Sequence, residues 1–222
     1  MKPYFILAIT AVCGIWNPLH AGVVYSTFGP GDTFKTLNAV AVGSSAANER
    51  NELAESFTPS SSFTLDSVRV AVFNLSGPNQ LTVYLASGSS QPGAPIESFS
   101  LTGLPCCDQT AAIMTATSSL HTTFSGGTRY WIVLSANDLT NTFDGWKGGL
   151  FPIAGTGESA LIRTSGTFPA WTSFSPDTTQ MAFDINGTTP EPATGALLLL
   201  GGLVVWVIYG RQRRFTPSRE LR

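Results

Sequence analysis

The sequence predicts an all-β body, an antiparallel two-sheet sandwich of the jelly-roll kind, between an N-terminal signal peptide and one C-terminal transmembrane helix. Alternation of apolar and polar residues dominates the body, and helical periodicity is nearly absent. Short alternating runs recur about every 10 to 20 residues and are separated by Gly, Pro, Asn and Ser. Such spacing is typical of a two-sheet β domain with many turns.

Residues 1–21 have the features of a signal peptide. Lys2 is a minimal positively charged start, and a mainly apolar stretch follows from Tyr4 to Ile15. The small residue Ala21, followed by Gly22, is typical of a signal-peptidase site. The alternative is an uncleaved anchor, but the apolar stretch is short for a membrane span. We therefore expect export, with a mature chain that begins at Gly22.

The body, residues 22–187, is large enough for one domain with a sizeable core. Between Gly22 and Thr189 six basic residues stand against twelve acidic ones, a net charge of −6, whereas the whole chain has −2. The difference arises because five arginines lie beyond residue 210. A mildly acidic body without a basic stripe argues against a nucleic-acid partner.

Two neighbouring segments show the clearest strand pattern. Val68, Val70 and Val72 alternate with residues of the opposite face, and the phase changes at Asp66-Ser67, where we expect a bulge. Leu81, Val83 and Leu85 alternate in the same way, after the turn residues Gly77-Pro78-Asn79. Further strands are expected at residues 96–101, 112–116, 129–135, 159–164 and 180–185.

One segment, residues 46–56 (AANERNELAES), has a composition that favours a helix. It predicts either a short helical turn or a charged loop, and the sequence does not separate these two alternatives.

Cys106 and Cys107 are the two cysteines of the body, and they are adjacent in the chain. Neighbouring Cα atoms lie about 3.8 Å apart, closer than the usual range of about 4.4 to 6.8 Å across a disulfide. In an oxidising compartment the alternatives are a strained vicinal disulfide, an intermolecular bridge or two free thiols. We favour the vicinal disulfide. No second cysteine or histidine cluster accompanies the pair, so we expect no metal site.

Residues 188–214 combine three features in a fixed order. Pro190, Glu191 and Pro192 come first, and an uncharged apolar run at 193–209 follows. The run holds 17 residues, nine of them Leu, Val or Ile. As a helix it would be roughly 26 Å long, close to the roughly 30 Å of a hydrocarbon core. Three arginines within four residues then oppose translocation and predict a cytoplasmic end. They are Arg211, Arg213 and Arg214.

This order of motif, helix and basic cluster resembles the PEP-CTERM protein-sorting signal of exported bacterial proteins. The resemblance implies recognition by exosortase, a membrane protease that cuts near the motif and passes the protein to the cell surface or extracellular matrix. One departure is the continuation at 215–222, which we expect to be a short cytoplasmic tail. The alternative is an ordinary single-pass anchor with an incidental proline-rich linker.

A second resemblance covers most of the body. Short motifs in a characteristic order are similar to the choice-anchor R domain, an extracellular β domain found before surface-anchoring signals. The resemblance implies a surface domain and carries no catalytic residues. The motifs are 24–34, 57–59, 63–68, 92–99, 128–131 and 144–146.

Candidate catalytic groups are few. His121 is the single histidine of the body, so a Ser-His-Asp hydrolase would need it, with Asp108 or Asp138 to orient the ring. No Gly-x-Ser-x-Gly motif is present. His121 lies in a polar run, and we expect it to face solvent. The chain is therefore interpreted as a non-enzyme without a cofactor.

Carboxylates are candidates for two kinds of site, a glycosidase-like pair and a calcium site. Asp144 and Glu158 are the best glycosidase-like pair, but we expect Asp144-Gly145 to form a turn and Glu158 to be a solvated charge. Asp32, Asp66 and Asp184 are candidate calcium ligands, although they do not form an Asp-x-Asp pattern.

Tryptophans are the remaining candidates for binding, because their flat faces stack on sugar rings. Trp131 lies in the most apolar expected strand and is predicted to be in the core. Trp146 and Trp171 lie among Gly, Pro and Ser residues and are predicted as candidate glycan contacts. A buried role for either is an equally open alternative.

The sequence thus predicts an exported protein, held in the membrane by its C-terminal helix and delivered to the surface or matrix, with a structural or interaction role. The expected partners are the membrane and an exosortase-like protease. The alternative is a carbohydrate-binding module on the same anchor, with polysaccharide as its partner.

Overall fold

The computed structural model describes residues 21–44, 50–138, 141–152, 158–164, 168–173 and 179–189. The chain divides into two compact units, Met1–Thr189 and Pro190–Arg222, and the second lies outside the described residues. Within the described ranges the fold is all-β, with one short 3-10 helix, η2 (Asp108–Thr110). The strands are β1 (Ala21–Ser26), β2 (Ala39–Ser44), β3 (Arg50–Phe57), β4 (Phe63–Ser76), β5 (Gln80–Ser87), β6 (Pro95–Thr102), β7 (Ala112–Thr117), β8 (Thr123–Phe124), β9 (Tyr130–Ala136), β10 (Phe143–Pro152), β11 (Ala160–Thr164), β12 (Phe168–Ser173), β13 (Thr179–Met181) and β14 (Phe183–Thr188).

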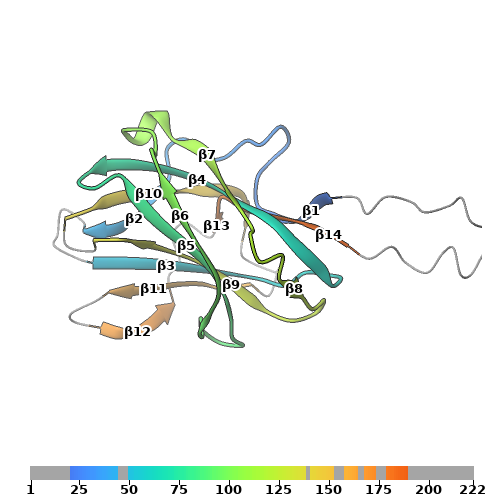
Figure 1. Ribbon diagram of the computed structural model, residues 1–222. Helices are drawn as coiled ribbons and strands as arrows, with labels where there is room; N and C mark the ends of the chain where they lie inside the picture. Colours follow the sequence, from blue (N-terminus) through green and yellow to red (C-terminus); the bar gives the residue numbers. More distant parts are fainter. Residues whose placement is uncertain are drawn as a thin grey trace, which may run out of the picture. The chain divides into compact units, whose positions relative to one another are not determined.

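The strands form one continuous antiparallel sheet in the order β1-β14-β4-β10-β2-β3-β9-β5-β6, with the other strands paired off this path (Figure 1). The expected division into two separate sheets is wrong. Its physical reason is β4, whose 14 residues pair with β14 along one stretch and with β10 along the next. This one strand therefore joins the halves that a sandwich would keep apart.

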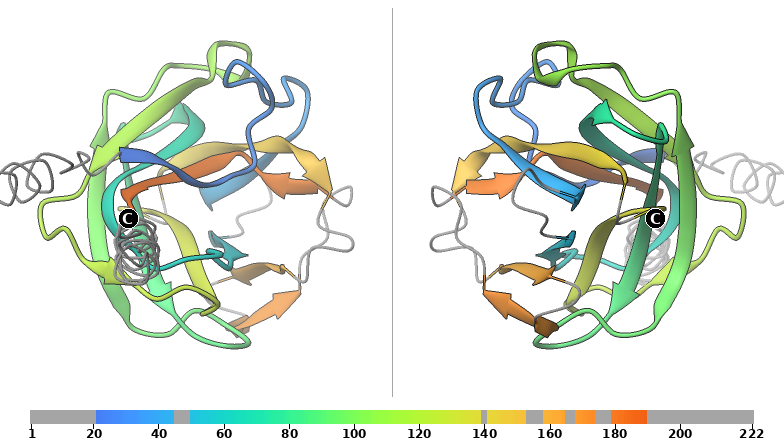
Figure 2. Two further views of the ribbon diagram at one scale, coloured as in Figure 1. Left: turned by 90° about the vertical axis from the view of Figure 1, so that its right-hand side faces the viewer. Right: turned by 90° about the vertical axis from the view of Figure 1, so that its left-hand side faces the viewer.

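The sheet curls round on itself, as the two views in Figure 2 show, and it encloses the main apolar core. Val68, Val70 and Val72 of β4 and Leu81, Val83 and Leu85 of β5 point into this core and are fully buried. Both alternation predictions are therefore confirmed. Phe57, Phe183 and Trp146 are among the aromatic rings that fill the centre.

The curled sheet brings β6, the last strand in the order, beside β7, which pairs with β4. The line along which β6 and β7 meet is called the seam, and Glu97 of β6 bridges it. The Glu97 carboxylate accepts hydrogen bonds from the Ser118 hydroxyl at 2.9 Å and from the Ser119 N–H at 3.1 Å, both in the turn after β7. Glu97 is only 5% exposed. Its buried charge is thus stabilised by donors that only the curled arrangement supplies.

The predicted bulge at Asp66 is confirmed. In the pairing of β14 with β4, Asn186 is opposite Ser67 and Gly187 is opposite Leu65, so that Asp66 is the extra residue. The turn at 77–79 also joins β4 to β5 as expected, and Gly77 has a φ of 83°, which favours glycine.

Residues 50–57 are strand β3 rather than the helical turn or charged loop expected for 46–56; residues 45–49 lie outside the described ranges. β3 pairs with β9 and β11, so that both of its edges are hydrogen-bonded. Leu53 and Phe57 point into the core, and Ala54 packs into a second apolar cluster with Trp131. Burial on both faces therefore overrides the helix-favouring composition.

Strands β1 and β14 pair along their lengths, so the two ends of the body lie together. Ala21 is opposite Thr188 and Gly22 is opposite Gly187. Signal-peptide cleavage between Ala21 and Gly22 stays a prediction; it would remove one residue pair from this ladder and leave the others. The described part of the chain ends at Thr189, one residue after the last strand.

Candidate functional site

The residues of the predicted sorting signal lie outside the described ranges. These are Pro190, Glu191, Pro192, the run 193–209 and the arginines Arg211, Arg213 and Arg214. Residues 1–20 of the predicted signal peptide lie outside them as well. No helix in the described part of the chain is long and apolar enough to cross a bilayer.

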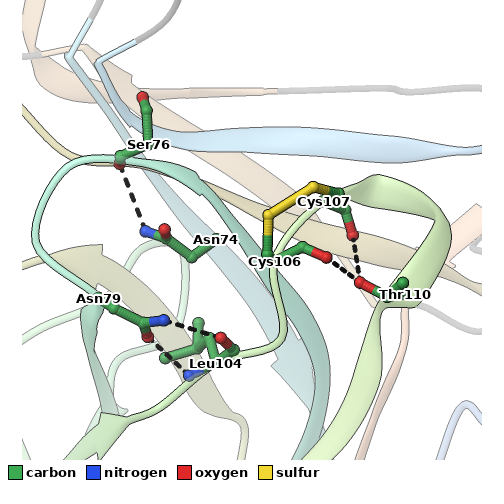
Figure 3. The surroundings of a disulfide bond; sticks show 7 residues. All are labelled: Asn74, Ser76, Asn79, Leu104, Cys106, Cys107 and Thr110. Carbon is green, nitrogen blue, oxygen red and sulfur yellow. Dashed lines mark hydrogen bonds between the residues drawn. A yellow bond between two sulfur atoms is a disulfide. The ribbon is translucent and has the colours of Figure 1, made fainter.

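The body has one unusual covalent feature, a disulfide between Cys106 and Cys107 (Figure 3). Both cysteines are exposed. Their segment runs along the end of β4, where the Asn74 N–H donates to the Pro105 carbonyl and the Cys107 N–H donates to the Asn74 carbonyl, both at 2.9 Å. The Thr110 hydroxyl donates to the carbonyls of both cysteines, so that it holds the turn between Cys106 and Thr110.

A second anchor holds the same segment at its start. The side-chain amide of Asn79 donates to the Leu104 carbonyl at 2.8 Å and accepts from the Leu104 N–H at 2.6 Å (Figure 3). Asn79 follows the turn after β4, so the chain before the cysteines is fixed to the β4–β5 connection.

Lys147 of β10 has a buried ammonium group beside this segment. Only 1% of its side chain is exposed, and its Nζ lies 2.5 Å from Asp108 Oδ1 and 2.5 Å from the Thr36 carbonyl. The ammonium also lies over the Phe73 ring, 5.2 Å from the ring centre. Asp108 thus compensates a charge that would otherwise be costly to bury.

A shallow cavity of about 310 Å³ lies next to this ion pair. Its wall is mostly apolar and includes Leu37, Val40, Phe73, Leu75 and Phe143, with Asp108 as its charged member. The cavity is therefore bounded on one side by Asp108, which follows Cys107 directly in the chain.

Asp144 is a fully buried carboxyl group near the start of β10, not part of a turn. Its Oδ1 accepts a hydrogen bond from the Asn74 amide at 2.8 Å, while its Oδ2 has no partner among the described residues. Burial raises the pKa of Asp144 to about 6, and the Asn74 amide partly offsets this rise.

The raised pKa of Asp144 predicts a specific pH dependence. The folded protein holds this proton more tightly than the unfolded chain, so the contribution of Asp144 to stability is largest at low pH. It falls as pH rises from about 4 to above 6, by up to about 3 kcal/mol in the free energy of unfolding. Urea unfolding of wild type and Asp144→Asn across this range measures it as the difference between the two.

Asp32→Asn is the matched control, because Arg69 lowers the pKa of the exposed Asp32. The difference between wild type and this variant should change with pH in the opposite direction. Parallel stability curves for wild type and Asp144→Asn would contradict the assignment.

The three tryptophans differ in burial. Trp131 is fully buried, so its predicted core position is confirmed. Trp146 is fully buried too, and its indole N–H donates to the Ala182 carbonyl at 3.0 Å. Of the two alternatives left open for Trp146, surface glycan contact or buried side chain, the structure shows the buried one. Trp171 is half-buried, and the Arg163 guanidinium lies 4.8 Å from its ring centre.

His121 faces solvent, with 61% of its side chain exposed. Its Nδ1 lies 3.3 Å from the Leu65 carbonyl and 3.9 Å from Asp66. The two expected orienting groups are elsewhere, since Asp108 pairs with Lys147 and Asp138 accepts from Asn141. The structure therefore does not bring together the triad that a hydrolase would need.

The three candidate calcium ligands do not come together at one place. Asp32 and Asp184 both bind Arg69, whose guanidinium donates to Asp184 Oδ2 from Nε at 2.9 Å and to Asp32 Oδ2 from Nη1 at 2.7 Å. Asp66 lies beside His121 instead. Within the described part of the chain no three His, Cys, Asp or Glu side chains are grouped to hold a metal ion.

The Asp144 and Glu158 pair is also divided between different partners. Glu158 accepts from the Ser56 hydroxyl at 2.6 Å and its side chain is only 5% exposed, so it is not the solvated charge expected from the sequence. Glu55 is a buried carboxyl group that the sequence reasoning missed. Burial raises its pKa well above the usual value, while a hydrogen bond from the Met181 N–H at 3.0 Å opposes the rise.

Comparison with known proteins identifies a sorting motif in the tail. The family model described as the PEP-CTERM protein-sorting motif matches residues 188–214. A comparison with curated proteins finds no match for the chain. The motif implies export, a C-terminal membrane association and processing by exosortase.

Proposed function

We propose that this chain is a non-enzymatic protein of the cell surface or extracellular matrix, with a body similar to choice-anchor R domains. The PEP-CTERM match over residues 188–214 carries the proposal. Residues 1–21 direct export, the helix 193–209 holds the chain in the membrane, and the arginines at 211–214 stay in the cytoplasm with residues 215–222. An exosortase-like protease then cuts near Glu191.

Features of the body support a structural or interaction role. Charged side chains of the body form contacts between strands. Arg69 joins β4 to β14, Glu97 joins β6 to the turn after β7, and Arg163 of β11 binds Glu52 of β3. These contacts stabilise an extracytoplasmic domain without assembling a reaction centre.

A carbohydrate-binding role is the second candidate from the sequence. Because Trp146 is buried, Trp171 is the remaining member of the two proposed glycan contacts. The Arg163 guanidinium already lies over the Trp171 ring. No observation favours polysaccharide as the partner, and the structural role takes precedence.

Alanine at Pro190, Glu191 and Pro192 together tests the proposal in the native host. We expect the surface amount to fall to background while uncut chain collects in the membrane fraction, because the protease loses its recognition sequence but the helix is retained. Immunoblots of surface and membrane fractions measure both. Deleting the host's exosortase-like gene should have the same effect on the wild-type chain.

The control variant is Phe215→Ala combined with Pro217→Ala, behind the arginine cluster, which should be sorted normally. Normal surface delivery of the Pro190, Glu191 and Pro192 variant would overturn the proposal.

A further inference from the structure

The Cys106–Cys107 disulfide is accessible and holds its backbone in a rarely populated conformation. Both cysteines are exposed. Cys107 has φ 73° and ψ 147°, a region that residues other than glycine seldom occupy. A ring that closes on adjacent residues constrains this torsion, and opening the ring lets φ return to negative values. Exposed, strained disulfides are the ones that exchange readily with thiols.

Rotation about the φ bond of Cys107 moves a defined part of the chain. The Cys107 N–H lies before this bond, so its hydrogen bond to the Asn74 carbonyl is retained. The Cys107 carbonyl lies after this bond and turns with it, and the residue attached to this carbonyl is Asp108. Its carboxylate is the one ion-pair partner of Lys147 among the described residues.

The loss of Asp108 has a large effect because of where Lys147 lies. With 1% of its side chain exposed, the ammonium group otherwise contacts the Thr36 carbonyl and the Phe73 ring. Neither carries a negative charge. The Asp108 side chain is 44% exposed, whereas the ammonium group that it compensates is buried. Withdrawing the carboxylate therefore leaves a buried charge uncompensated, which is destabilising.

We infer that Cys106–Cys107 is a thiol–disulfide exchange site for an extracytoplasmic dithiol, and that its reduction withdraws Asp108 from the buried Lys147. The site thereby couples the redox state of the surface to the stability of the body and to the wall of the cavity beside Asp108. This inference does not depend on how the tail is sorted.

The reaction balances as an ordinary exchange. One thiolate of the dithiol attacks a cysteine sulfur, the Cys106–Cys107 bond breaks, and the released cysteine thiolate takes a proton. The second thiolate of the dithiol then attacks its own sulfur in the mixed disulfide, which frees the other cysteine as a thiol. The dithiol is oxidised to a disulfide, and the protein gains two electrons and two protons.

The test uses the full-length chain, purified in mild detergent and treated with dithiothreitol without denaturant. Alkylation followed by mass spectrometry of the tryptic peptide 70–129, which contains both cysteines and not Cys13, reports their reduction. We expect two alkyl groups on this peptide and a Tm lower by roughly 5 to 10 °C, restored by reoxidation.

Asp108→Asn separates the coupling from simple loss of a cross-link. In the oxidised chain this variant should lower Tm by a similar amount, and in the reduced chain it should have little further effect, because the ion pair is already lost. Lys147→Met, which removes the buried charge, should abolish most of the response to dithiothreitol. The Cys106→Ser, Cys107→Ser chain should behave as the reduced protein.

Two results would overturn the inference. One is a disulfide that resists dithiothreitol until the body unfolds. The other is an equal effect of Asp108→Asn on Tm in the oxidised and reduced chains, which would show that the disulfide does not position Asp108.

Discussion

Replacing Trp146 by alanine is expected to lower the free energy of unfolding of the body by about 3 to 5 kcal/mol. Trp146 is fully buried and packs against Phe183, with ring centres 6.2 Å apart. Its indole also donates to the carbonyl of Ala182, the residue between β13 and β14. At Ala182 the chain changes its pairing partner, because β13 pairs with β10 and β14 pairs with β4. The Trp146 ring therefore packs where these two pairings diverge. Urea unfolding followed by circular dichroism measures the loss.

Trp171→Ala is the matched control and should cost about 1 kcal/mol or less, because the ring is half-buried and its cation–π contact with Arg163 is near the surface. Equal losses for the two variants would contradict the assignment of Trp146 to the core. A stable Trp146→Ala protein that loses binding to a glycan would do so as well.

The parts of the fold that the sequence predicted are those with strict local alternation. In the middle of β4, at Val68, Val70 and Val72, and in β5, at Leu81, Val83 and Leu85, every second residue is a large aliphatic one. A strand with one face in the core requires this pattern. The bulge at Asp66 could be predicted for the same reason, since an extra residue changes the phase of the alternation.

Other strands could not be predicted because their environment is set by distant residues. In β3 both faces are buried, one in the main core and one against β11 and Trp131, so alternation is lost. Asp144-Gly145 has the composition of a turn, yet both residues belong to β10 and pair with β2 and β4. The ring of Phe73 covers Gly145 so closely that a Cβ there would lie 2.1 Å from its Cζ. The glycine therefore serves a close approach rather than a turn.

The candidate sites show the same division between local and distant information. The adjacency of Cys106 and Cys107 can be seen directly in the sequence, as can the tripeptide, apolar run and arginines of the tail. Arg69 with Asp32 and Asp184 cannot, because its partners lie 37 and 115 residues away. The sequence offered Asp32, Asp66 and Asp184 as candidate calcium ligands without a supporting spacing, and the sheet instead pairs two of them with an arginine.

The body and the tail have separate roles in this account. The body is a stable curled sheet whose buried charges are mostly compensated, with an exposed disulfide positioned beside one of them. The tail carries the sorting signal, a motif that matches residues 188–214. Sorting is therefore the central claim.

Mass spectrometry of the mature protein from its native host tests this claim most directly. We expect surface or matrix material whose C-terminal residue lies beside Glu191 and which lacks the apolar run 193–209, because exosortase cleaves before the helix. An intact C-terminal sequence through Arg222 in the surface material would contradict the account and would make the tail an ordinary membrane anchor.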